Sequence, residues 1–234
     1  MTGSPIYFVH LSNPLSLDLV AEARARGVPA LAETCPHFLG LDDRVYQRPD
    51  AQRFLMTPPI RSAEMRDGLW RRIEAGSVQT VGSDHCGYSL AQRGDTSSFT
   101  QVASPGIPGV ETTLLILHTF GVRAGHLDMP GLVRLTSTNP AKVFGLWPRK
   151  GRIEAGADAD LVLFDPRPRR ALHASELHSA AAFSPFEGLE VEGRVARTIC
   201  RGRPVYADGR VMGESTWGRF IERAPFDPDL AARL

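Results

Sequence analysis

From the N-terminus to Pro148, short apolar runs alternate with stretches whose apolar residues recur at helical spacing. The short runs predict three strands, at residues 6–9, 28–32 and 78–81. The helical stretches predict helices at residues 13–27, 61–76, 110–120, 129–135 and 139–145. Strands and helices in alternation favour parallel βαβ units, and therefore an α/β fold.

After Pro148 the pattern changes to short β-branched segments separated by Gly, Asp and Pro. These segments predict an all-β part, with strand residues at 153, 159–164, 195–200 and 204–206. The tail from Phe226 onward is expected at the surface or in a contact. Three barrel-type strands cannot close a barrel, which needs about eight. The chain is therefore either an open sheet or the C-terminal portion of something larger.

Composition narrows the class of protein. The 234 residues are 42% hydrophobic and 23% charged, as in an ordinary globular protein. A net charge of +1 gives no electrostatic footprint for nucleic acid or an anionic membrane, and no apolar run approaches the roughly 20 residues that span a bilayer. The first residues lack a secretory-signal pattern. Three widely spaced cysteines argue against a disulfide framework, so a cytoplasmic location is expected.

Two residues that end predicted strands are candidates for chemistry. His10 follows the first strand and Asp84 follows the third. The carboxyl ends of barrel strands converge on one mouth, so an imidazole and a carboxylate there are plausible ligands of a catalytic metal. Taken singly, His10 is more often a loop residue or the neighbour of a helix cap, and Asp84 a helix cap or turn residue. Their joint position at two strand ends raises the metal interpretation to equal weight with these simpler ones.

Other polar residues have simpler interpretations. His85 should point away from Asp84 along an extended chain, which suggests either a structural role or one that supports a ligand residue, and His37 is expected to be a loop histidine. Cys35 and Cys86 have no Cys-x-x-Cys partner, so structural burial is expected for both. The proline-stiffened stretch from Thr57 to Arg61 and the turn from Gly106 to Glu111 are either plain turns or ligand-facing backbone.

Several strings, taken in order, resemble one family. They are His10-Leu11-Ser12, Glu33-Thr34-Cys35-Pro36-His37-Phe38-Leu39, Thr57-Pro58-Pro59-Ile60-Arg61, Ser83-Asp84-His85-Cys86, Gly106-Ile107-Pro108-Gly109-Val110-Glu111, Ser137-Thr138-Asn139-Pro140-Ala141-Lys142 and Lys150-Gly151-Arg152-Ile153. Together they are similar to the cyclic-amide amidohydrolases. The later strings, from Phe183 to Gly188 and from Arg201 to Gly209, fit the dihydropyrimidinase and hydantoinase branch best.

The resemblance implies a fold, a cofactor and site residues. The fold would be the C-terminal part of a TIM-type (β/α)8 barrel, about three strands in residues 1–148, plus part of a small β-sandwich and a tail in residues 149–234. Two divalent metals, commonly zinc, would be bridged by a carboxylated lysine and a hydroxide. His10 would match a ligand of one metal, and Asp84 a ligand of the other that also carries the proton.

The substrate implied is a cyclic amide or imide, whose ring opens to an N-carbamoyl amino acid. Thr57 matches a residue that contacts the substrate through its backbone. Ser104 and Pro105 fall where the family usually has Asn-Gly, so the asparagine that makes this substrate contact in the family is missing here.

The sequence also departs from the family pattern. It contains no His-x-His pair and no lysine before Lys142, so it holds only the ligands at His10 and Asp84. We therefore expect an incomplete chain whose partner is a missing N-terminal half, or a second copy in a homo-oligomer. Two alternatives stay open: a non-catalytic dihydropyrimidinase-like assembly protein, and an allantoinase- or dihydroorotase-type hydrolase.

Overall fold

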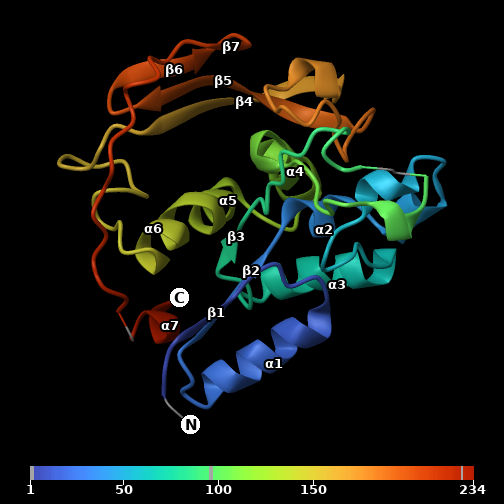
Figure 1. The fold of residues 1–234 in the computed structure, drawn as a ribbon. Helices are drawn as coiled ribbons and strands as arrows, with labels where there is room; N and C mark the ends of the chain where they lie inside the picture. The colour runs from blue at the N-terminus through green and yellow to red at the C-terminus, as the bar shows by residue number, and fades with distance from the viewer. Residues whose placement is uncertain (1–2, 95–96, 228) are drawn as a thin grey trace.

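A parallel three-stranded sheet forms the first layer of the computed structural model, which describes residues 3–94, 97–227 and 229–234. Its strands are β1 (Ile6–Phe8), β2 (Ala30–Thr34) and β3 (Thr80–Val81), in the order β1-β2-β3. All three predicted strands are present. β2 begins later than predicted and continues to Thr34, and β3 keeps only the last residues of its apolar run. The middle strand therefore has a neighbour on each side (Figure 1).

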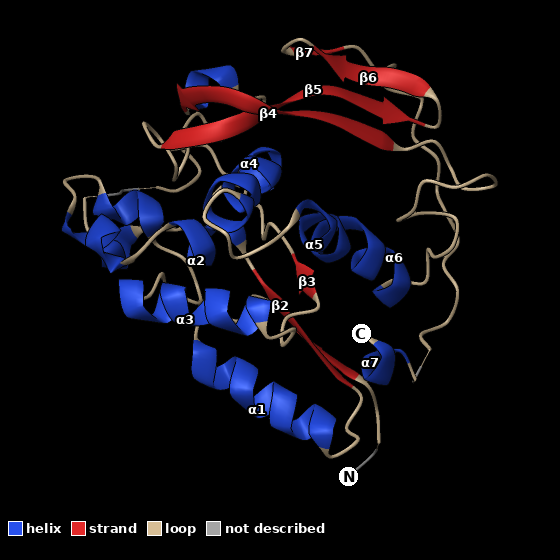
Figure 2. Ribbon diagram, turned by 180° about the vertical axis from the view of Figure 1, so that it is seen from behind, coloured by secondary structure: helices blue, strands red, loops and turns tan. Residues whose placement is uncertain are grey.

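Two helices cover one face of this sheet. α1 (Pro14–Ala25) begins where the Asn13 side chain accepts the Ser16 amide, and α3 (Ala63–Glu74) begins where Ser62 accepts the Met65 amide. Such side-chain caps satisfy the free amides of a first helical turn. Their apolar faces join the strands in the main core, which includes Leu17, Val20, Ala30, Ala32, Leu69, Ile73 and Val81. Figure 2 shows α1 and α3 next to each other, on the same side of the strands.

The remaining helices are short. The predicted helix after residue 110 is a 3-10 turn (Val110–Thr112), α4 (Thr113–Leu117) and a π-helical turn (His118–Val122). The next two predicted helices are also present. α5 (Met129–Val133) continues through a π-helical turn (Arg134–Thr138) into α6 (Asn139–Val143). The sequence did not predict α2 (Pro36–Gly40), α7 (Leu230–Arg233) or the 3-10 turns at Asp43–Gln47, Ala51–Phe54, Phe99–Gln101 and Ala174–Glu176.

A four-stranded antiparallel sheet forms the second layer. It contains β4 (Leu161–Ala171), β5 (Glu190–Cys200), β6 (Arg203–Ala207) and β7 (Arg210–Val211), in chain order. Leu115 and Ile116 of α4 pack against Phe186 and Val191 beneath it (Figure 1). The all-β character was predicted, but β4 and β5 are longer than expected. Ile153 was wrongly expected in a strand, and it lies in a loop with its side chain 88% exposed.

The C-terminal tail folds back onto the parallel sheet. Leu230 and Ala231 of α7 are buried against Leu31 of β2 and Val143 of α6. Arg24 of α1 donates to the Ala231 carbonyl at 2.8 Å. The tail after Phe226, which was expected at the surface or in a contact, thus makes an internal contact. Figure 1 shows α7 and the C-terminus next to β1.

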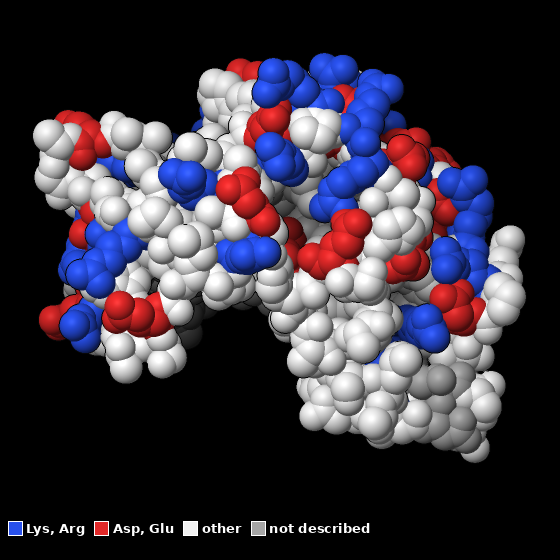
Figure 3. All heavy atoms as spheres, turned by 90° about the horizontal axis from the view of Figure 1, so that it is seen from above, with Lys and Arg blue, Asp and Glu red and all other residues white. Residues whose placement is uncertain are grey.

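Charges of both signs are mixed on the face that carries the antiparallel sheet. Figure 3, which looks down on this side, shows Lys and Arg side chains next to Asp and Glu. Several are ion pairs, such as Arg167 with Asp165 and Arg123 with Glu192. Within the described residues, no helix has the length and apolarity to cross a membrane.

Candidate active site

His10 and Asp84 lie just past the carboxyl ends of β1 and β3, one on each side of the end of β2. The Leu11 amide donates to the Glu33 carbonyl at 2.8 Å, and the Gly82 amide donates to the Thr34 carbonyl at 3.1 Å. These bonds hold both loop starts to the middle strand. The predicted placement of the two residues at neighbouring strand ends therefore matches the observed topology.

Both residues have left-handed backbone conformations. The φ angle is 44° at His10 and 45° at Asp84. Non-glycine residues rarely adopt positive φ, and such strain gathers at functional sites, where surrounding structure holds it in place. The His10 side chain is half-buried, and that of Asp84 is exposed.

The first turn after β2 brings two more titratable groups to the same edge. The Cys35 thiol is fully buried, and its pKa is raised by burial and then by the charges of Glu33 and Asp84. His37 is 2% exposed, and its pKa is lowered to about 3 by burial and then by the charge of His10. His37 was expected from the sequence to be a loop residue; it is instead a buried residue of α2.

Glu33 of β2 anchors a network that the sequence interpretation missed. Its carboxylate accepts the Tyr7 hydroxyl at 2.5 Å, and the same hydroxyl lies 2.6 Å from Oγ1 of Thr80. Gly82 lies directly against this carboxylate, since a Cβ there would be 2.5 Å from Oε2. One side chain from each strand therefore takes part. The sequence signal that could have revealed this network is Glu33 itself, a charged residue directly after the apolar run of residues 28–32.

The donor set fits a divalent metal in kind. An imidazole and a carboxylate are ligands that zinc accepts, and Nε2 of the buried His37 has no hydrogen-bond partner among the described residues. The number of donors is incomplete. Among the described residues no group of three or more His, Cys, Asp and Glu side chains could hold a metal ion. His10 and Asp84 can therefore supply part of a metal site.

The candidate substrate segments lie on linked loops. The side chains of Thr57 and Pro105 are exposed and that of Ser104 is half-buried. Gly106, next to Pro105, donates its amide to the Leu55 carbonyl at 2.8 Å, which joins the loop of residues 104–109 to the segment that leads to Thr57. The fully buried Arg93 donates to the Gly106 and Gln52 carbonyls and supports both segments.

His85 and Cys86, next to Asp84, face the same loop. Nδ1 of His85 accepts the amides of Gly109 and Val110 at 3.0 and 3.3 Å. The Cys86 amide donates to the Ile107 carbonyl at 3.0 Å. His85 was expected to be structural, and it does make structural hydrogen bonds. Burial was expected for both cysteines; it is confirmed for Cys35, whereas Cys86 is only half-buried because it lies in an open loop.

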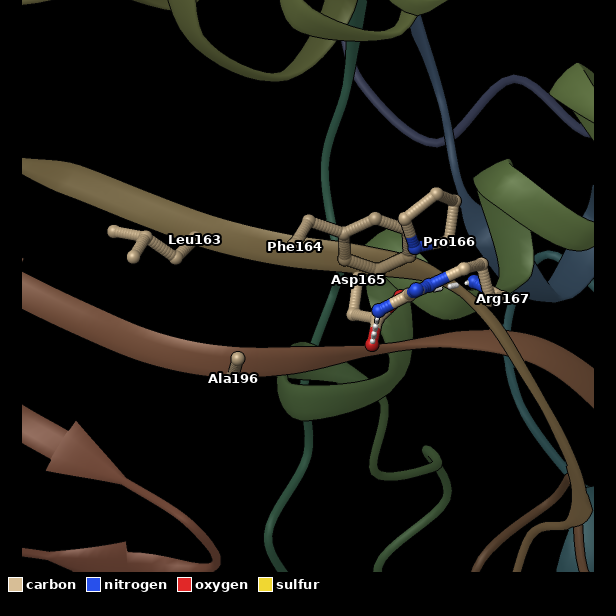
Figure 4. A pocket seen from close by; sticks show the side chains of 6 residues that line it. All are labelled: Leu163, Phe164, Asp165, Pro166, Arg167 and Ala196. Carbon is tan, nitrogen blue, oxygen red and sulfur yellow. Dashed lines mark hydrogen bonds and ion pairs between the residues drawn. The ribbon is translucent and has the colours of Figure 1, made fainter.

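A separate depression of about 390 Å³ lies on the antiparallel sheet. Its lining residues all belong to β4 and β5 and are Leu163, Phe164, Asp165, Pro166, Arg167 and Ala196 (Figure 4). Arg167 is hydrogen-bonded to Asp165, so this surface offers a neutralised ion pair. None of the predicted site residues lies in it.

Comparisons with known proteins add an independent line of evidence. The model of the amidohydrolase family matches residues 10–205. D-phenylhydantoinase from Escherichia coli O1:K1 / APEC is 42% identical over 227 residues, which are 97% of this chain and 49% of that protein. The chain thus spans about half the length of the curated relatives it matches.

Solved structures agree with this match. Dihydropyrimidinase from Brevibacillus agri NCHU1002 superimposes with a TM-score of 0.91 at 36% identity, over 96% of this chain and 50% of that one. L-hydantoinase from Arthrobacter aurescens gives a TM-score of 0.87 at 34% identity, over 94% of this chain and 49% of that one. The two layers described above thus recur in half of each of these longer chains.

Proposed function

Because this chain belongs to the amidohydrolase family, we propose that it is the C-terminal half of a hydantoinase- or dihydropyrimidinase-type hydrolase of cyclic amides. Its three parallel strands are the C-terminal part of a TIM-type barrel. The observation that carries the proposal is the pair His10 and Asp84, each in a left-handed conformation at the end of a strand that flanks β2.

The proposed reaction opens the ring of a cyclic amide or imide to an N-carbamoyl amino acid. Water adds its oxygen to the ring carbonyl carbon, the carbon–nitrogen bond breaks, and a proton passes to the leaving nitrogen. We propose that Asp84 takes the proton from water and returns it to that nitrogen, because a carboxylate can serve as base and then as acid.

The metal that this family implies would be held in part by His10 and Asp84, and we propose zinc. When bound, such a metal lowers the pKa of water toward about 7 and polarises a carbonyl. Thr57, Ser104 and Pro105 are proposed to contact the substrate, and their loops are joined through Leu55 and Gly106. This linkage would hold the substrate segments in a fixed relation.

The proposed partner is an N-terminal half that carries the other metal ligands, with further copies in a homo-oligomer. We propose residues 1–148 as the barrel part, and residues 149–234 as the β-sandwich part with the tail. A cytoplasmic location is proposed because all three cysteines are free thiols, which suit a reducing compartment.

A complementation experiment tests the proposal. The chain is purified alone and after co-expression with the N-terminal half of a D-phenylhydantoinase, and both samples are assayed with hydantoin, dihydrouracil, allantoin and dihydroorotate alongside metal analysis. We expect turnover of the first two substrates, and bound zinc, only in the complex. Asp84→Asn should abolish turnover, and His10→Asn should lower metal content. His173→Asn, an exposed histidine paired with Glu187, is the matched control.

Three outcomes would contradict the proposal. Full turnover with two bound metals in the isolated chain would overturn the half-enzyme interpretation. A stable complex that turns over none of the substrates would favour the assembly protein. Turnover confined to allantoin or dihydroorotate would move the chain to that branch.

A further inference from the structure

The loop after β3 runs beside the loop of residues 106–110 and is bonded to it at consecutive positions. The Cys86 amide donates to the Ile107 carbonyl, and His85 Nδ1 accepts the amides of Gly109 and Val110. Gly106 has φ 126° and lies against Cys86, since a Cβ there would be 2.5 Å from Sγ. Backbone and side-chain contacts together fasten the two loops.

The imidazole of His85 caps the helical stretch that starts at Val110. Amides at the start of a helix have no partner within the helix, and an acceptor placed there satisfies them. Because Nδ1 accepts two N–H groups, the ring proton of neutral His85 resides on Nε2. Gly87 leaves room on that side, since a Cβ there would be 3.1 Å from Nε2.

Residues 106–111 are also bonded to other parts of the molecule. Both carboxylate oxygens of Glu111 engage His178, one its amide and one its Nδ1, each at 2.8 Å. Arg93 donates to the carbonyl of Gly106 from a fully buried position. Apart from its contact with the Asp84 loop, this loop is thus fixed to the rest of the molecule. Residues 85 and 86 tie the Asp84 loop to it, in addition to the Gly82 bond that holds the start of the Asp84 loop to β2.

We propose that His85 is a positioning residue that sets the place of Asp84 relative to the candidate substrate loop at Ser104 and Pro105. It acts through the acceptor at Nδ1, which joins the two loops, and not by contact with the substrate. This inference rests on the proposed function, from which Asp84 and the substrate loop take their roles. The left-handed φ of 45° at Asp84 is then maintained by bonds on both sides, at Gly82 and at His85.

Two substitutions of similar size separate this role from others. Oδ1 of an asparagine reaches the position of Nδ1, whereas the amide of a glutamine reaches the position of Nε2. In the full 234-residue chain, His85→Asn should keep the amide hydrogen exchange of Gly109 and Val110 near the wild-type rate. His85→Gln should speed that exchange roughly tenfold, because both amides lose their acceptor. The same two changes at His173 serve as controls.

Activity is measured in the complex with the N-terminal half. Loss of such a supporting contact typically lowers activity about 10- to 100-fold. His85→Gln should therefore lose that factor in kcat/KM, and His85→Asn should recover most of it. If His85→Gln does not fold, wild-type exchange and turnover in His85→Asn are still required.

Several results would overturn the inference. Rescue by glutamine and not by asparagine would assign the role to Nε2. Equal exchange at Gly109 and Val110 in all variants would show that the contact does not fasten the loops. Loss of zinc in His85→Asn while Gly109 and Val110 exchange at the wild-type rate would instead assign His85 a direct contact with the metal. If wild-type complex shows no turnover while exchange follows the expected pattern, the proposed function fails and the loop contact stands.

Discussion

At the residue scale, the Tyr7–Glu33–Thr80 network joins the three parallel strands below the candidate site. Burial, followed by the hydrogen bond to Glu33, raises the pKa of Tyr7, so the phenol stays protonated and donates. Since its one proton goes to Glu33, the hydroxyl of Thr80 is left to donate to the phenol oxygen. The network thus fixes a carboxylate between the strand ends that lead to His10 and Asp84.

Removal of the phenol oxygen should destabilise the fold. Tyr7→Phe leaves the half-buried Glu33 carboxylate without this donor, so we expect a loss of about 1.5–3 kcal/mol in the free energy of unfolding. Urea unfolding followed by circular dichroism measures it. Tyr88→Phe, at a tyrosine that is 39% exposed, is the control and should change little. Equal stability of the two variants would show that the network contributes nothing.

The His178–Glu111 pair predicts a pH dependence of stability. The hydrogen bond and charge of Glu111 raise the pKa of His178 above its usual 6.5. A raised folded pKa gives stability that is fully present below the unfolded pKa and is lost as pH rises through the folded pKa. Both side chains are at least a third exposed, so the effect should stay below about 1 kcal/mol.

Urea midpoints measured from about pH 5.5 to 8 in wild type and Glu111→Gln test this pair. The wild type should lose more stability over that range, because glutamine cannot favour the charged imidazole. Parallel pH profiles for the two proteins would contradict the prediction.

The candidate ligands could be predicted from the sequence, and their support could not. His10 and Asp84 end apolar runs, and this local signal survives in the structure. The partners of Tyr7 are 26 and 73 positions away, and those of His85 are 24 and 25 positions away. Such contacts depend on how strands and loops are brought together, which periodicity does not encode.

At the element scale, the observed strand bounds differ from the predicted ones where strand pairing, and not residue propensity, decides where a strand begins or ends. Val28 lies in an apolar run, yet its amide bonds back to Ala23 at the end of α1, so β2 starts at Ala30. Conversely, Glu190 to Glu192 include two charged residues but extend β5, because they pair with residues 169–171 of β4. Gly193 there has φ 97° and lies against the Phe164 ring, a position that only glycine fits without strain.

The C-terminal helix α7 should stabilise the parallel sheet in spite of its length. Leu230 is 6% exposed and packs with Leu31 and Val143. Leu230→Ala should therefore lower the free energy of unfolding by about 2 kcal/mol or more, as large-to-small core changes do. Leu15→Ala on α1 is the matched control, because Leu15 is 67% exposed. If the two variants unfold at the same urea concentration, α7 does not stabilise the parallel sheet.

At the scale of the whole molecule, both sheets have an edge strand with a neighbour on one side only within the described residues. β1 pairs with β2 alone, and β4 pairs with β5 alone. Large apolar side chains are exposed on both strands: Ile6, Phe8, Val162 and Leu163. Unpaired edges offer free backbone donors and acceptors, which other strands can join. The relatives, which are about twice as long, superimpose on both layers together.

The β1 edge should therefore drive association of the isolated chain. Phe8 is 37% exposed on this edge, and a lysine there opposes strand pairing by charge. We expect wild-type chain to elute as a concentration-dependent oligomer in size-exclusion chromatography with light scattering, and Phe8→Lys to shift it toward monomer. Leu19→Lys, at a residue of α1 that is 57% exposed, adds the same charge away from the edge and should leave the oligomer unchanged.

The same substitution bears on the proposed half-barrel partner. If β1 is the strand that an N-terminal half joins, Phe8→Lys should also weaken capture of that half during co-purification, while Leu19→Lys should not. A wild-type chain that is a monomer at all concentrations, and that captures the N-terminal half equally well with either lysine, would mean that the β1 edge is not an interface. The two halves would then have to meet through other surfaces, such as the edge at β4 with its exposed Val162 and Leu163.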